Sequence, residues 1–132
     1  MREILFRAKR IDNGEWVEGD LSYLIHNKEK MYVFPADGLD SADRYEVNPE
    51  TLCQYTGLKD KNGNRIWEND ICRYYNPEDK DGIGIIKEDY VSWIKGAIAQ
   101  TNLMTPMFYL KVGKEFEVIG NIFDNPELLK GE

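Results

Sequence analysis

The sequence predicts a single-domain, mainly β protein, built as a small antiparallel barrel or sandwich with one or two short helical turns. Short runs rich in β-branched and aromatic residues alternate with Asn-Gly, Asn-Pro and Asp-Gly turn signals, a spacing typical of such folds. Aromatic residues make up 12% of the sequence, and their rings pack well on pleated surfaces. The chain has 132 residues, the length of one domain, and no segment keeps a long 3.6-residue hydrophobic period.

The first predicted hairpin joins a strand within residues 3–11 to a strand at 15–25. Between them lies Asn13-Gly14, the preferred pair for a two-residue type I′ turn, in which both central residues have positive φ. A third strand is expected at residues 28–34.

The segment after the third strand is predicted to be irregular and then briefly helical. Residues 38–45 are polar and are expected to form a mobile loop. At 47–52, Asn48 is a suitable N-cap and Pro49 fits the first helical position. The segment is so short that we expect a single turn of 3₁₀ helix.

The central hairpin is predicted from a strand at 52–58, a turn built on Asn62-Gly63, and a return strand at 65–75. The charged residues around Asn62-Gly63 are expected to remain in water. We interpret this dense stretch as a hairpin with its closing turn rather than as an active-site loop.

The C-terminal half is predicted to continue as strands. A loop of turn residues at 76–82 precedes a hairpin at 83–94 that turns near Glu88-Asp89. Residues 95–112 fit either a strand or a short helix at first, and Pro106 excludes one continuous helix. A strand is expected at 115–123, and residues 124–129 repeat the Asn-Pro-Glu helix start.

One internal similarity predicts two bends. Residues 16–24 and 66–74 align so that Gly19 matches Asn69 and Asp20 matches Asp70. Since Gly and Asn are the residues that most readily adopt positive φ, we expect a bulge or tight bend at both positions. The aspartate that follows each is expected to accept hydrogen bonds from freed backbone N–H groups.

Composition excludes several classes of function. The net charge is −7 and the pI is about 4.8, which argues against non-specific nucleic-acid binding and against an anionic membrane surface. We find no signal peptide and no apolar run long enough for a membrane helix. The two cysteines, Cys53 and Cys72, are expected to be reduced in a cytoplasmic protein.

Three stretches resemble the YopX family of phage and prophage proteins: "MREILFRAKR" at 1–10, "VNPETLCQYTGLKDKNGNRIWENDI" at 47–71 and "VIGNIFDNPELL" at 118–129. The family's Glu-Gly-Asp is Glu68-Asn69-Asp70 here, which retains access to positive φ. The resemblance implies a small, mainly β protein with an SH3-like barrel substructure, encoded by bacteriophages or integrated elements. It implies no enzymatic activity and no cofactor.

Candidate chemistry is sparse, so we expect no catalytic residues, no metal site and no cofactor. His26 is the only histidine, and it shows no metal-ligand spacing with Cys53 or Cys72. The cysteines are interpreted as small buried apolar residues. The paired acids Glu18/Asp20 and Glu68/Asp70 have the residue types of a general acid and base, but turn chemistry explains their repetition better.

The remaining hypothesis is binding. A recognition surface could be formed by Gln54 and Tyr55 with Trp67 and Tyr109 as anchors, because Tyr and Trp are favoured at protein contacts; the alternative is that these residues are structural. We expect a non-catalytic interaction module with a host or phage protein as partner, able to self-associate through an uncovered sheet edge. The alternative is a nucleic-acid-associated protein, or an acidic inhibitor of a host nucleic-acid-binding protein.

Overall fold

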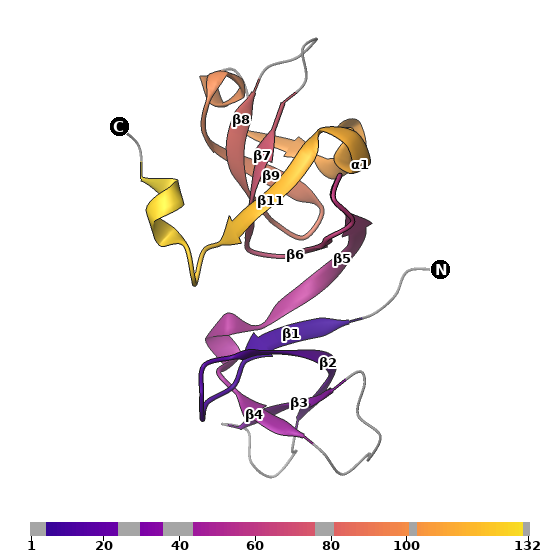
Figure 1. Cartoon of the computed structure of the whole chain (residues 1–132), viewed down its shortest axis with the longest axis vertical. Helices are drawn as coiled ribbons and strands as arrows, with labels where there is room; N and C mark the ends of the chain where they lie inside the picture. The colour runs from indigo at the N-terminus through magenta and orange to yellow at the C-terminus, as the bar shows by residue number, and fades with distance from the viewer. Residues whose placement is uncertain (1–4, 24–29, 36–43, 76–80, 101–102, 131–132) are drawn as a thin grey trace. The chain divides into compact units, whose positions relative to one another are not determined.

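The computed structural model describes residues 5–23, 30–35, 44–75, 81–100 and 103–130. The chain divides into two compact units, Met1–Tyr55 and Thr56–Glu132 (Figure 1). Its strands form two antiparallel sheets with the orders β4-β3-β2-β1-β5-β6 and β10-β9-β8-β7-β11. The prediction of a mainly β, antiparallel fold is therefore confirmed. Within the described ranges, neither sheet closes into a complete barrel.

Four antiparallel strands build the first unit: β1 (Phe6–Lys9), β2 (Trp16–Tyr23), β3 (Met31–Pro35) and β4 (Tyr45–Val47). The start of β5 (Cys53–Lys59) pairs with β1, with Phe6 opposite Gln54. An isolated bridge between Arg10 and Val47 links the end of β1 to β4. Because β1 and β4 are the outer members of this four-strand run, the bridge requires the sheet to curl.

The core of the first unit lies inside this curl. Met31 and Val33, two residues apart in β3, are both buried, because side chains two residues apart on a strand lie on the same face. They pack in one cluster with Ala8 of β1 and Val47 of β4. A loop was predicted at residues 38–45. Residues 36–43 lie outside the described part of the chain, and β4 begins at the last position of the predicted loop, Tyr45.

The turn at Asn13-Gly14 differs from the type I′ prediction, which is wrong. Gly14 has a φ of 73°, but Asn13 does not have positive φ. Arg10 N–H donates to Glu15 O at 2.9 Å, and Gly14 N–H donates to Arg10 O at 3.0 Å. The loop therefore holds four residues, a length most often built around a type I turn.

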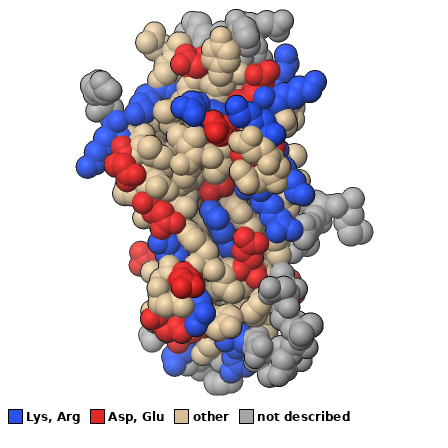
Figure 2. Space-filling model, viewed as in Figure 1, with Lys and Arg blue, Asp and Glu red and all other residues tan. Residues whose placement is uncertain are grey.

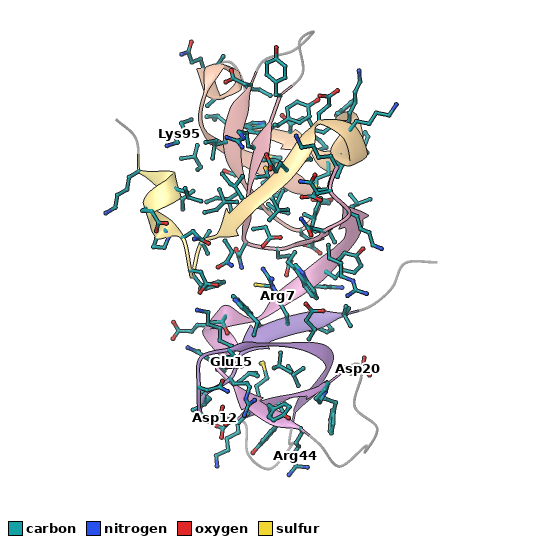
Figure 3. All side chains as sticks on the ribbon, viewed as in Figure 1. Arg7, Asp12, Glu15, Asp20, Arg44 and Lys95 are labelled. Carbon is teal, nitrogen blue, oxygen red and sulfur yellow. The ribbon has the colours of Figure 1, made fainter. Side chains whose placement is uncertain are left out.

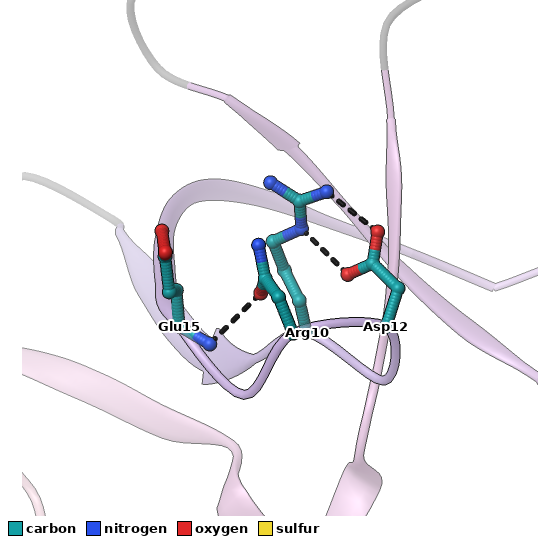
Figure 4. A network of polar contacts seen from close by, with 4 residues as sticks. Arg10, Asp12 and Glu15 are labelled. Atoms are coloured by element: carbon teal, nitrogen blue, oxygen red, sulfur yellow. Dashed lines mark hydrogen bonds and ion pairs between the residues drawn. The ribbon is translucent and has the colours of Figure 1, made fainter.

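Side chains hold this loop in place, as Figure 4 shows. Asn13 Oδ1 accepts the Glu15 N–H at 2.9 Å. The Arg10 guanidinium binds the Asp12 carboxylate through two contacts, of 2.9 and 2.6 Å. Hydrogen bonding to Arg10 holds the pKa of Asp12 below its ordinary value.

The second unit contains β6 (Arg65–Trp67), β7 (Asp70–Tyr74), β8 (Gly82–Ile86), β9 (Tyr90–Lys95), β10 (Met104–Pro106) and β11 (Phe116–Asn121). β6 lies beside β5 in the first sheet, and the other five form the second sheet. The core centres on Tyr74, whose ring centroid lies 5.9 Å from that of Trp93 and 5.5 Å from that of Phe116. Cys72 and Val91 belong to the same buried cluster.

The predicted turn at Asn62-Gly63 closes the central hairpin. Asp60 N–H donates to Asn64 O at 2.9 Å, and Gly63 N–H donates to Asp60 O at 3.0 Å. Gly63 has a φ of 83°, and Asn62 does not have positive φ. This is the three-residue loop in which a type I turn is followed by a left-handed glycine.

Short helical turns complete the molecule: η1 (Pro49–Thr51), η2 (Ala97–Gln100), η3 (Met107–Tyr109), η4 (Pro126–Leu129) and the four-residue α1 (Val112–Glu115). The two predicted helix starts are confirmed as 3₁₀ turns, but their asparagines act differently. Asn48 caps η1 by accepting the Glu50 N–H at 3.0 Å. Asn125 does not cap η4, and its Oδ1 accepts the Asn121 N–H at 3.2 Å. Among the described residues, no helix has the length and apolar character needed to cross a membrane.

Candidate functional site

The two aligned bends do not have the same conformation. Asn69 has a φ of 69°, so the prediction at that position is confirmed. Its N–H donates to Ile86 O at 2.8 Å, and its carbonyl accepts the Ile122 N–H at 3.0 Å. The prediction at Gly19 is wrong, because Gly19 lies within β2, paired without a register shift to Phe6 and Pro35.

The aspartates that follow these two positions, Asp70 and Asp20, also differ in their surroundings. Asp70 is buried and its Oδ2 accepts the Trp67 N–H at 2.8 Å, as predicted for a bend. Asp20 is exposed on β2 (Figure 3) and lies opposite Phe34 of β3. In the described parts of the chain, no three His, Cys, Asp or Glu side chains are grouped closely enough to hold a metal ion.

A buried carboxylate that the sequence analysis did not single out organises the central hairpin. Asp60 Oδ1 accepts the backbone N–H groups of Asn62 and Asn64 at 3.0 and 2.9 Å. Its Oδ2 accepts the Val118 N–H of β11 at 2.9 Å, beside the bond from Lys61 N–H to Phe116 O at 3.0 Å. An aspartate at the start of a turn is the signal that could have found it.

The protonation of Asp60 follows from these bonds. Burial raises the pKa of Asp60, but the hydrogen bonds from three backbone N–H groups and from the Asn64 side chain together lower it by more, so the net pKa lies below the ordinary value. The carboxylate is therefore charged at neutral pH, and its hydrogen bonds join the hairpin loop to β11.

Both cysteines are buried, as predicted. Burial raises the pKa of the Cys72 thiol well above its usual range, so this thiol is protonated and unreactive at neutral pH. Cys53 Sγ contacts Thr51 O at 3.3 Å. His26 lies outside the described residues.

Most of the residues predicted to form a recognition surface are not exposed. Tyr55 and Trp67 are 4% and 2% exposed, and Gln54 is half-buried in β5 opposite Phe6. Tyr109 is the exception, because it is 72% exposed. Anchors for a partner must be accessible, so the structural interpretation of Tyr55 and Trp67 fits their burial better.

Shortly before Tyr109 in the chain lie exposed apolar side chains that the sequence analysis did not identify. Leu103 is 84% exposed, Met104 54% and Phe108 81%. The Phe108 and Tyr109 ring centroids lie 4.5 Å apart at an interplanar angle of 33°. We refer to residues 103–109, which comprise β10, η3 and Leu103, as the apolar segment.

The interior of the apolar segment is well anchored. Met107 is buried in the core, and its N–H donates to Asp89 O at 2.9 Å. Trp93 donates through Nε1 to Thr105 Oγ1 at 2.8 Å, and its N–H donates to Leu103 O at 3.0 Å. The exposed rings therefore stand on a fixed backbone, which reduces the entropy lost on binding.

Several of the described basic residues in the first unit face aromatic rings. The Arg7 guanidinium lies 4.4 Å from the Trp16 ring centroid, with Lys9 Nζ at 5.5 Å from the same ring. Arg10 lies 4.0 Å from the Tyr45 ring centroid. These cation–π contacts occupy aromatic faces that base stacking would require.

Comparison with known proteins gives a family and a fold. The family model described as "YopX protein" matches residues 5–130. A solved structure, "Crystal structure of protein EF1440 from Enterococcus faecalis", is similar over 98% of this chain and 100% of that chain, with 24% sequence identity and a TM-score of 0.54. No curated protein matches the sequence.

Proposed function

The chain belongs to the YopX family, and we propose that it acts by binding another protein, without catalysing a reaction. The observation that carries this proposal is the exposure of Leu103, Phe108 and Tyr109 in the apolar segment. Aromatic residues are enriched at protein contacts and contribute much of their binding energy.

The exposed area supports the proposal. Two aromatic side chains as accessible as Phe108 and Tyr109 expose together roughly 300 Å². Leu103 and Met104 expose further apolar surface in the same segment, and apolar patches of a few hundred Å² on soluble proteins often mark interaction sites. Since apolar surface of this extent is unfavourable in water, its presence on an anchored backbone is best explained by a partner that covers it.

Binding through side chains is favoured over binding through a strand edge. β10 is the outer strand of its sheet, but it has three residues and ends in Pro106, which lacks an N–H. At β11, the opposite edge, the Val118 N–H is bonded to Asp60 and the Asn121 N–H to Asn125. Self-association by edge pairing therefore has few free backbone donors in the second sheet.

We extend the proposal to origin and setting. The family resemblance supports a gene carried by a phage or prophage, and a protein that works in the bacterial cytoplasm. The absence of catalysis is supported by the structural use of Asp70 and by the burial of both thiols. The nucleic-acid alternative has no comparable observation in its favour, because the net charge is −7.

The test compares affinity capture from phage-infected host cells with two baits. One bait is the natural chain, and the other carries Phe108→Ser and Tyr109→Ser. We expect at least one protein to be retained by the natural chain and lost with the double variant, because the two rings supply the contact area.

The matched control is Ile11→Ser, which removes an exposed apolar side chain in the first unit and is expected to leave capture unchanged. Equal recovery of the same proteins by the natural chain and the double variant would contradict the proposal. Loss of capture with Ile11→Ser as well would also contradict it, because binding would not depend specifically on the apolar segment.

A further inference from the structure

We infer that Asn62 is a site of spontaneous covalent modification: its side chain loses ammonia by intramolecular deamidation, and the product loosens the bonds that join the central hairpin loop to β11. The site lies in the hairpin loop at 60–64 and shares no residue with the apolar segment. It therefore stands or falls separately from the proposed function.

Deamidation at an Asn-Gly pair needs only water as a co-reactant. The glycine nitrogen loses its proton and attacks Cγ of the asparagine; an N–Cγ bond forms, the Cγ–Nδ2 bond breaks, and ammonia leaves with that proton. Water then opens the five-membered succinimide. Cleavage of the new N–Cγ bond gives aspartate, and cleavage of the bond to the backbone carbonyl carbon gives isoaspartate. Glycine favours ring closure because no Cβ shields its nitrogen.

The chain contains two Asn-Gly pairs, Asn13-Gly14 and Asn62-Gly63, and all four residues are exposed. Each glycine has positive φ, and each glycine N–H donates a backbone hydrogen bond of 3.0 Å to the residue that begins its loop. The two attacking nitrogens are therefore held alike, and a local opening has to release either of them.

The two asparagine side chains are held differently. Asn13 Oδ1 accepts the Glu15 N–H at 2.9 Å, which keeps that amide in one orientation. Among the described residues, the Asn62 side chain has no hydrogen-bond partner, and only its backbone N–H is bonded, to Asp60 Oδ1. The Asn62 amide can rotate toward Gly63 without losing a bond, so Asn62 is expected to react faster than Asn13.

The isoaspartate product changes the backbone of a closed loop. Its main chain passes through Cβ and Cγ, which adds one atom between residues 62 and 63. In the unmodified loop, Asp60 Oδ1 accepts the N–H groups of Asn62 and Asn64 at 3.0 and 2.9 Å. A longer backbone moves these two donors apart, so the carboxylate cannot keep both bonds together with its bond to the Val118 N–H of β11.

The added charge matters less than the added atom. Figure 2 shows Asp and Glu side chains interspersed with Lys and Arg on the surface, and Lys61 beside Asn62 is exposed. Water and salt screen an exposed carboxylate in such surroundings. We therefore expect the aspartate product to leave the loop in place and the isoaspartate product to loosen it.

The test follows deamidation of the natural chain, Asn62→Ser and the matched control Asn13→Ser in mildly alkaline buffer. Peptide mass spectrometry measures the loss of each amide, and enzymatic methylation measures isoaspartate. The natural chain unfolded in urea controls for sequence context, because both side chains are then unconstrained.

We expect Asn62 to react roughly two- to tenfold faster than Asn13 in the folded chain, the range that one hydrogen bond accounts for, and at a similar rate in urea. Asn62→Ser is expected to remove most of the product, and Asn13→Ser to leave it. Equal rates in the folded chain, a faster Asn13, or reaction only in urea would overturn the assignment of the site.

The consequence is tested on the isoaspartate fraction, separated by ion exchange. Amide hydrogen exchange at Val118 is compared among this fraction, the natural chain and Asn62→Asp, which adds the charge without the extra atom. We expect faster exchange in the isoaspartate fraction alone. A Val118 N–H that stays protected there, or that exchanges equally fast in Asn62→Asp, would overturn the loosening by a longer backbone.

Discussion

Asn69 occupies a backbone position that few residues tolerate. Its φ of 69° lies in the left-handed region, and both its N–H and its carbonyl are hydrogen bonded. The connection from β6 to β7 has only Glu68 and Asn69 between the strands, so the chain passes from one sheet to the other within two residues. Asparagine and glycine are the residues that accept this conformation at least penalty.

We predict that Asn69→Ala destabilises the protein by about 1–2 kcal/mol, since a β-carbon without a compensating polar group is unfavourable at positive φ. Asn69→Gly is the control and is expected to be much less destabilising. Urea denaturation measures both free energies of unfolding. An alanine variant as stable as the natural chain would show that positive φ at this position carries no penalty.

Asp60 is the second residue on which local structure depends. Its carboxylate accepts three backbone N–H groups, one of them from β11. We predict that Asp60→Asn, which keeps the shape but removes the charge and one acceptor, destabilises the protein by about 1.5–3 kcal/mol at pH 7. The free energy of unfolding in urea checks this value.

The same variant has a defined pH dependence. The pKa of Asp60 is lowered in the folded state, so its contribution to stability is present above the unfolded-state pKa of about 3.9 and is lost as pH falls through the folded-state pKa. We therefore expect the stability difference between the natural chain and Asp60→Asn to shrink from pH 7 to pH 3. A difference in the free energy of unfolding that stays constant over this range would contradict a stabilising role of the charged carboxylate.

At the scale of elements, two glycines of β8 allow neighbouring elements to approach its backbone closely. A Cβ added at Gly84 would lie 2.8 Å from the Ser92 carbonyl oxygen and 2.5 Å from Val91 Cγ1. A Cβ at Gly82 would meet the Ile98 side chain of η2. The glycines of β8 therefore allow β9 and η2 to pack directly against its backbone.

We predict that Gly84→Ala destabilises the protein by about 1–3 kcal/mol, because the Ser92 carbonyl is part of a paired strand and cannot move aside. Gly113→Ala is the matched control, since a Cβ there meets no atom within 4 Å. Thermal unfolding compares the two variants. Equal melting temperatures for Gly84→Ala and the natural chain would mean that β8 and β9 separate more easily than their contacts indicate.

The elements also show how far the sequence leads. The positions of strands and turns could be predicted from β-branched runs and from glycine, because they depend on local chemistry. The type of the Asn13-Gly14 turn could not be predicted in this way, since the pairing of Arg10 with Glu15 fixes the length of the loop. Gly19 resembles Asn69 in sequence, yet its pairing on both sides keeps it in a regular strand.

For the whole molecule, the division into two units and the location of the exposed rings were not predictable. Tyr55 and Trp67, which lie in predicted strands, are buried, whereas Phe108 and Tyr109, in the stretch 95–112 for which the sequence left strand and helix open, are exposed. Which face of a strand meets the core depends on long-range pairing, and a shift of one residue exchanges the two faces. The family match spans residues of both units.

The most direct measurement of the central claim compares stability and binding in the Phe108→Ser, Tyr109→Ser variant. Because both side chains are largely exposed, we predict a free energy of unfolding within about 0.5 kcal/mol of the natural chain. Capture of the proteins that the natural chain retains from phage-infected host cells is predicted to be lost. A variant that unfolds much more easily yet still captures the same proteins would show that the two rings stabilise the fold, and would contradict their role in recognition.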